Sequence, residues 1–305
     1  DTGAVAHPQG TAESAFRIPF FKQTLGMSEE ELDAFRKAQP PVDDTHFTVR
    51  WMSSQNQTTR HHELGYWSWM DGVLDPPVTY KDSTAEAVTV TPTFFNALGW
   101  TDSAACGRRG GATYLETFKT ALKHRPRVIF LHQWNEFSGQ SEGHGYGPDH
   151  NIYLDTYSVE LSDDLEPVSL TAPGYRGDHG GWGFYDLNLT RALMQLYRGQ
   201  ARCSTLLAVS SPLRDAVIEG RTLAVAWNTI GEPVKSFSVQ IDGKTLVQIS
   251  GQEVNLPLSG LAKGRHTVTV IADGAVTYYP LSRVRLDEPQ DTPLPVRVDV
   301  PFWIR

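Results

Sequence analysis

The segment that most constrains the fold of this chain is an apolar run that ends in a cluster of polar side chains. It spans residues 127–137 and reads RVIFLHQWNEF. A run of this kind is typical of a buried parallel strand that delivers side chains to a site at its carboxyl end. The residues placed there are His132, Gln133, Trp134, Asn135 and Glu136. We therefore expect the functional site at this strand end, the alternative being polar groups that only cap loops.

The side chains at this strand end are suited to carbohydrate hydrolysis. Glu136 can donate or accept a proton, or act as the nucleophile at a sugar acetal. Trp134 offers a flat apolar face to a pyranose ring. The remaining three, His132, Gln133 and Asn135, can form hydrogen bonds with sugar hydroxyl groups. The pattern thus favours a carbohydrate substrate.

Composition excludes several other classes of function. The net charge is −8 and the basic residues form no run, so a nucleic-acid partner is not expected. No stretch approaches 18 uninterrupted apolar residues, and we expect no membrane span. We also expect no cofactor. We expect no metal either, because His61-His62-Glu63 resembles a metal cluster only superficially: adjacent imidazoles point apart. Cys106 and Cys203 could form a disulfide or remain two free thiols.

The length of 305 residues predicts two domains, and the patterning differs between the two parts. Residues 1–202 alternate strand-like and helix-like stretches, which predicts an α/β region, whereas residues 203–305 predict an all-β, immunoglobulin-like sandwich. A capping box of Ser28 and Glu31 opens a helix. The expected helices are 28–39, 113–124 and 185–197. The expected strands are 46–52, 65–70, 87–92 and 127–134 in the first part, and 205–210, 222–227, 236–241, 245–249 and 266–272 in the second.

Aromatic and polar residues follow the earlier strands as well. The stretch GYWSWMDG supplies Trp67, Trp69 and Asp71, and VTVTPTFFNALGW supplies Asn96 and Trp100. Loops after parallel strands build the active site of a (β/α) barrel, so these residues predict a sugar-binding cleft. For any single Trp, packing in the core is the favoured alternative. A glycine-rich loop after residue 137 adds Gln140, Glu142 and His144.

The run SDDLEP contains three carboxylates, Asp163, Asp164 and Glu166. They could bind calcium or a positively charged loop. A solvated loop in which an Asp caps a turn is the favoured interpretation.

The succession of YWSW, VTVTP and VIFLHQWNEF resembles the carboxyl-terminal half of glycoside hydrolase family 99-like barrels, including the WbsX domain of bacterial polysaccharide clusters. The resemblance covers residues 45–200. The family's WNEW-type motif appears here as Trp134-Asn135-Glu136-Phe137. The resemblance implies a (β/α) TIM-type barrel in which Glu136 is a catalytic carboxylate.

The chain departs from this family at two points. Family 99 enzymes carry a second glutamate three residues after the first, where this chain has Gly139. Glu142, Asp71 and Glu63 are the alternative acid partners. In addition, only four strands precede the sandwich, and half a barrel would expose its edge strands. Either the amino-terminal half of the barrel lies on a second polypeptide or on an upstream segment, or the early residues contain strands that the pattern does not show; we favour a missing amino-terminal half.

Together these observations predict a secreted or periplasmic glycoside hydrolase that acts on a complex polysaccharide. The main alternative is a non-catalytic glycan-binding protein that uses the same cleft. A structural or surface-display module is the third interpretation.

Overall fold

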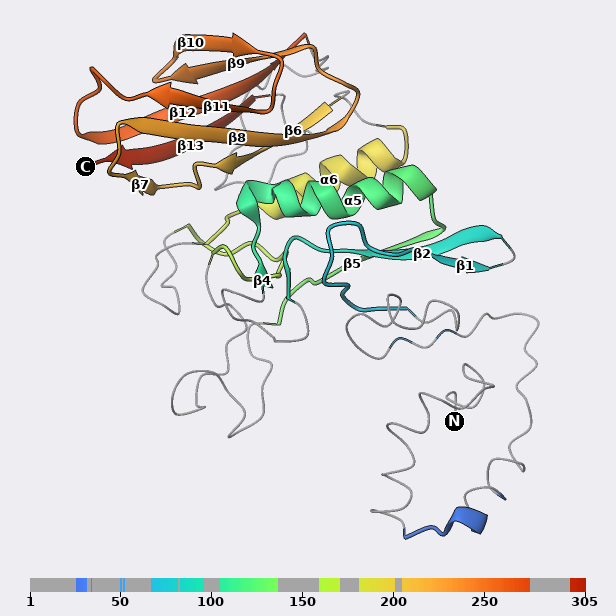
Figure 1. Ribbon diagram of the computed structural model, residues 1–305. Coiled ribbons are helices and arrows are strands. Elements are labelled where there is room, and N and C mark those ends of the chain that lie inside the picture. The colour runs from blue at the N-terminus through green and yellow to red at the C-terminus, as the bar shows by residue number, and fades with distance from the viewer. Residues whose placement is uncertain are drawn as a thin grey trace.

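The computed structural model describes residues 26–31, 34, 50, 52, 67–81, 83–95, 105–136, 159–170, 181–200, 205–274 and 297–305. Within these residues the elements stack in layers (Figure 1). A β-sandwich lies on one side, two helices lie in the middle, and a three-stranded sheet lies on the other side. The helices are α5 (Ala112–His124) and α6 (Tyr185–Tyr197).

The three-stranded sheet contains a parallel crossover. Its strands are β1 (Thr79–Lys81), β2 (Thr84–Val90) and β5 (Val128–Leu131), in the order β1-β2-β5. Strand β2 pairs in parallel with β5, and α5 makes the connection between them. The apolar residues of α5 recur on one face, as the helical period requires, and become fully buried. They are Tyr114, Leu115, Phe118 and Ala121.

The prediction of a TIM-type barrel is wrong for the described residues. Their only parallel pair in this sheet is β2 with β5, because β1 runs antiparallel to β2. Most of the strand expected at 46–52 and the start of that at 65–70 lie outside the described residues; within these two ranges Met52 and Trp67 form a parallel bridge. Helices of a barrel form an outer ring, whereas here a sandwich sheet covers α5 and α6. The second polypeptide was inferred from half a barrel, and that inference falls with it.

The sandwich is formed by two sheets. One has the order β10-β9-β12-β13-β7 and the other β11-β8-β6. Strand β9 alternates half-buried and buried residues, as a strand with one face on a core must. Its inward residues Phe237, Val239 and Ile241 join a core that includes Trp227. The strands are β6 (Thr205–Ser211), β7 (Ala216–Ile218), β8 (Thr222–Gly231), β9 (Ser236–Ile241), β10 (Lys244–Ile249), β11 (Glu253–Pro257), β12 (Gly264–Asp273) and β13 (Arg297–Ile304).

Several local predictions are confirmed. Ser28 and Glu31 form the reciprocal hydrogen bonds of a capping box. Asp242 and Gly243 connect β9 to β10 with positive φ angles of 50° and 81°, as a tight hairpin requires. Sequence patterning missed β7, β11 and β13 in the sandwich. Outside it, patterning missed β1 and the paired two-residue strands β3 (Phe94–Phe95) and β4 (Ala105–Cys106). Strand β13 contains Pro301, which lacks an N–H group and weakens the strand signal.

Strand β6 of the sheet β11-β8-β6 is buried on both of its faces. Leu207 and Val209 of β6 point into the sandwich core, whereas Leu206 and Ala208 join a second core with α5 and α6. The short 3₁₀ helix Arg109–Gly111, which precedes α5, also lies close to β6: a Cβ added to Gly110 would lie 1.9 Å from the Val209 carbonyl oxygen. The α/β part and the sandwich therefore share one apolar layer.

Among the described residues, no helix is long and apolar enough to cross a membrane.

We expect Leu206→Ala and Leu207→Ala to destabilise the same unfolding transition. Each removes a fully buried side chain, and such changes cost about 2–5 kcal/mol. Because β6 joins the two cores, thermal unfolding followed by circular dichroism should show one cooperative step in both variants. Leu246→Ala, at a side chain that is 42% exposed, is the control and should leave the transition almost unchanged. Two separate transitions would contradict the shared layer.

Candidate functional site

The candidate site lies where the carboxyl end of β5 meets residues 162–166. The backbone N–H of Leu165 donates to the Gln133 carbonyl oxygen at 2.9 Å, and that of Glu166 donates to the Trp134 carbonyl oxygen at 2.8 Å. These bonds fix residues 162–166, which we call the acidic segment, along the polar end of the strand. The segment and the strand end therefore place their side chains together.

His132 and Asp163 form a buried pair within the site. The Nε2 atom of His132 lies 2.7 Å from Asp163 Oδ2, and both side chains are about nine-tenths buried or more. The imidazole also stacks on Trp69, with ring centroids 5.0 Å apart. These contacts hold the His132 ring from two sides, so it is packed beneath the surface.

Asp164 is the most enclosed carboxylate of the acidic segment. Its Oδ1 accepts the backbone N–H of Glu136 at 2.7 Å and the side-chain amide of Gln133 at 3.4 Å. Its Oδ2 accepts the Ser162 hydroxyl at 3.2 Å. Burial, and then the neighbouring charge of Asp163, raise the pKa of Asp164 from 3.8 to about 6. Asp164 thus anchors the backbone that carries Glu136.

The interpretation of the run SDDLEP as a solvated loop is wrong for its two aspartates. Asp163 is 3% exposed and Asp164 is fully buried. A hydrophilic run gives no local sign of burial, because the residues that cover it come from the end of β5. Glu166 stays half-buried, and the Asn135 side-chain amide donates to its carboxylate.

Trp134, Asn135 and Glu136 of the strand end reach solvent, and of these Trp134 and Asn135 are exposed. Trp134 is 52% exposed, which is unusual for so large an apolar side chain. Glu136 is half-buried, at the position where its backbone bonds Asp164. Together with Glu166, Glu136 gives the site two carboxylates that solvent can reach.

Of the other predicted site residues, some pack within the fold and the rest lie outside the described part of the chain. Trp67 packs edge-on against Phe130 and lies 3.3 Å from Glu86 through its indole nitrogen, so it covers the strand. Asp71 is buried and accepts the Ser68 hydroxyl at 2.8 Å. The residues that lie outside the described part of the chain are Glu63, Asn96, Trp100, Gln140, Glu142, His144 and Cys203.

Neither a disulfide nor a metal centre is seen in the described part. Cys106 has a free thiol that lies 3.6 Å from the Thr113 hydroxyl. No group of His, Cys, Asp and Glu within the described ranges could hold a metal ion.

Arg108 contacts the acidic segment on the side away from the strand end, and no pattern in the sequence predicts this role. Its guanidinium forms a buried ion pair with Asp186 and donates to the Asp164 carbonyl oxygen at 2.7 Å. It also lies 4.0 Å above the Trp182 ring, whose indole N–H donates to the Glu166 carbonyl oxygen at 2.8 Å. Burial raises the pKa of Asp186, and the charge of Arg108 opposes that shift.

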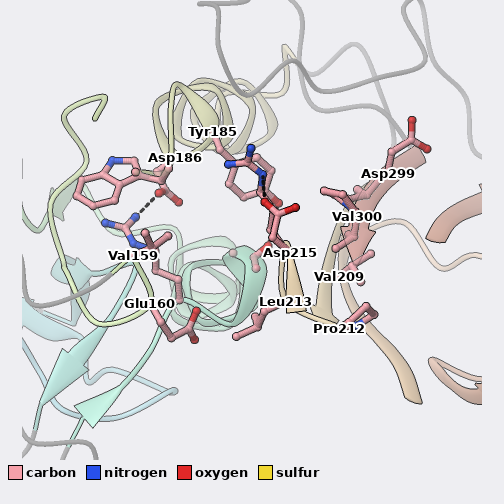
Figure 2. A pocket seen from close by; sticks show the side chains of 18 residues that line it. Val159, Glu160, Tyr185, Asp186, Val209, Pro212, Leu213, Asp215, Asp299 and Val300 are labelled. Atoms are coloured by element: carbon pink, nitrogen blue, oxygen red, sulfur yellow. Dashed lines mark hydrogen bonds and ion pairs between the residues drawn. The ribbon is translucent and has the colours of Figure 1, made fainter. Parts of the chain in front are cut away.

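A cavity of about 300 Å³ lies behind this arrangement, between the helices and the sandwich. Figure 2 shows Glu160 and Asp186 on one side, with Leu213, Pro212 and Val300 on the other. Arg108 and Trp182 also line it. Burial raises the pKa of the Glu160 carboxyl, against the opposing effect of its hydrogen bond from the Arg109 backbone.

Comparison with known proteins identifies no family. No family model matches the chain, and no curated protein does. The solved structures that match include the fibronectin(III)-like modules of Clostridium thermocellum CbhA, with 15% identity, a TM-score of 0.23, and coverage of 33% of this chain and 96% of that chain.

Two further matches are with longer chains. The N-terminal four Ig domains of Dscam1 isoform 4.44 are 17% identical, with a TM-score of 0.21 and coverage of 34% of this chain and 21% of that chain. The FMN-binding beta-glucuronidase from Facaelibacterium prausnitzii L2-6 is 10% identical, with a TM-score of 0.24 and coverage of 54% and 22%. Likenesses at this level carry no argument about function.

We expect the contribution of Asp164 to the stability of the protein to fall as the pH rises from about 4 to about 6. The folded pKa of Asp164 is raised above its ordinary 3.8, so folding favours the neutral carboxyl and loses stability as that carboxyl ionises. Asp164→Asn should flatten this slope in urea unfolding measured between pH 4 and pH 7. Glu219→Gln, at an exposed glutamate of the sandwich, should leave it unchanged. An identical slope in wild type and Asp164→Asn would show that Asp164 has an ordinary pKa.

Proposed function

We propose that this protein is a glycoside hydrolase that cleaves O-glycosidic bonds of a polysaccharide, with Glu136 as a catalytic carboxylate. The observation that carries the proposal is the grouping at the end of β5. Glu136 and Glu166 are half-buried carboxylates close to the exposed Trp134, since Glu136 follows it by two residues and the Glu166 N–H donates to its carbonyl oxygen at 2.8 Å. Paired carboxylates beside a flat apolar surface are what hydrolysis of a sugar acetal needs.

The two carboxylates divide the reaction between them. One, protonated, gives its proton to the glycosidic oxygen as the bond from that oxygen to the anomeric carbon breaks. The other either attacks the anomeric carbon or takes a proton from the water that attacks it. Water supplies the hydroxyl group of the product, and the leaving group departs as an alcohol. Gln133 and Asn135 are placed to contact sugar hydroxyls from the same strand end.

In this proposal the buried side chains beneath Glu136 and Glu166 hold the site in place and do not contact substrate. Asp164 holds the Glu136 backbone, and the His132–Asp163 pair fills the space below. In this proposal the protein acts outside the cytoplasm, where complex polysaccharides are found.

Glycan binding without hydrolysis is the second candidate. It is favoured because Asp164, a carboxylate of the same site, already accepts three hydrogen bonds. A carboxylate occupied in this way holds the backbone and does not take part in hydrolysis. The two candidates differ in what Glu136 contributes.

We expect Glu136→Gln to lower kcat about 10²–10⁴-fold, because the amide cannot transfer a proton or act as nucleophile. Release of reducing ends from a panel of polysaccharides measures this, and binding of the same glycans should persist. Glu253→Gln, on β11 of the sandwich, is the matched control and should retain full activity. Full activity in Glu136→Gln would remove this residue from the mechanism. Wild-type binding with no turnover on any glycan would favour the second candidate.

We also expect Trp134→Ala to weaken glycan binding by about tenfold or more, since an aromatic face contributes a stacking surface beyond its buried area. Affinity electrophoresis in gels containing the polysaccharide measures the effect. Trp303→Ala provides the control, because Trp303 is a similarly exposed tryptophan at 43% but lies on β13 of the sandwich. Equal losses in the two variants would indicate non-specific contact through exposed rings.

A further inference from the structure

We infer that Arg108 is a positioning residue that sets the separation of the Glu136 and Glu166 carboxylates through the acidic segment. The inference rests on the proposed function for its catalytic meaning. The contacts that hold residues 162–166 in place are present whether or not the protein hydrolyses glycans.

Arg108 and Trp182 act on the segment at its backbone. Arg108 Nη2 donates to the Asp164 carbonyl oxygen at 2.7 Å, and Trp182 Nε1 donates to the Glu166 carbonyl oxygen at 2.8 Å. The guanidinium lies 4.0 Å above the Trp182 ring, and this cation–π contact holds the side chains of Arg108 and Trp182 in place against each other. They therefore fix the backbone on either side of Leu165.

The opposite side of the segment bonds the strand end. Asp164 Oδ1 accepts the Glu136 N–H at 2.7 Å, and the Glu166 N–H donates to the Trp134 carbonyl oxygen at 2.8 Å. A movement of the segment would thus move Glu166 directly and release the backbone of Glu136. Arg108 therefore acts on both carboxylates through the backbone of the acidic segment and contacts neither of them.

Asp186 fixes Arg108 in turn. Both side chains are at least nine-tenths buried, and the ion pair leaves Asp186 Oδ1 and Arg108 Nε without hydrogen-bond partners among the described residues. A buried pair of this kind adds little net stability, since its desolvation cost offsets its attraction. We take its retention at this place as a sign that it specifies a position.

The test uses a double variant, Arg108→Met with Asp186→Leu, because apolar replacement of both partners leaves no uncompensated buried charge. The variant should fold, with a melting temperature near that of the wild type. Its acidic segment should loosen and hydrate, and the carboxyl of Asp164 should then titrate at least one pH unit lower. Carbon-13 NMR of labelled aspartate follows this titration directly.

The charged groups that surround Asp164 must be considered in reading this titration. They are Asp163 beside it, His132 paired with Asp163, Glu136 and Glu166 at the rim, and Arg108 with Asp186 behind its carbonyl. The matched control is Arg214→Met with Asp215→Asn, which removes a more exposed ion pair from the opposite wall of the cavity. It should leave the Asp164 titration where it is in the wild type.

An unchanged Asp164 titration in the folded double variant would overturn the inference. If the double variant does not fold, Arg108→Lys replaces it, because one ammonium group cannot reproduce the planar fork and the ring stacking together. Arg108→Lys should then lower the Asp164 titration, and no change would again overturn the inference. On an active glycan, kcat should fall at least tenfold in either variant. A shifted titration with no glycan hydrolysed by the wild type would keep the positioning role and reject the proposed function.

Discussion

The fold depends on the burial of one strand, β6, on both of its faces. Strand β6 sends alternate apolar residues to the sandwich core and to the helices α5 and α6. Burial of apolar area is the dominant favourable term in folding, and a strand buried on both faces contributes it to two cores at once. The helices in turn cover β2 and β5, so the strand end that carries the candidate site is fixed through them to the sandwich.

The charged side chains of the candidate site fall into two groups, one that solvent reaches and one that is buried. Glu136 and Glu166 stand at the rim, whereas Asp164 and the ion pair of Arg108 with Asp186 lie beneath. Buried charges persist only when they are paired or accept hydrogen bonds, and the contacts of Arg108 and Asp164 meet that condition. The inner groups therefore hold the backbone, and the outer carboxylates remain available for chemistry.

The wrong barrel prediction has a specific physical origin. The crossover of β2, α5 and β5 gives the same local pattern in a barrel and in a small mixed sheet. What distinguishes them is the partner at each strand edge and the cover on the helices. Here the antiparallel strand β1 takes one edge of β2, and the sandwich covers α5. Neither contact can be predicted from the hydrophobic periodicity of residues 84–131.

The sequence by itself determined the helices, several of the strands and the residues that the end of β5 presents. The periods of residues 113–124 and 236–241 and the turn at Asp242-Gly243 depend on near neighbours, so they could be predicted. Only the tertiary structure decided that Asp163 and Asp164 are buried and that Arg108 meets Asp186, 78 residues away in the chain. Such contacts depend on which segments pack together, and a single sequence carries no periodic signal for a pair so distant.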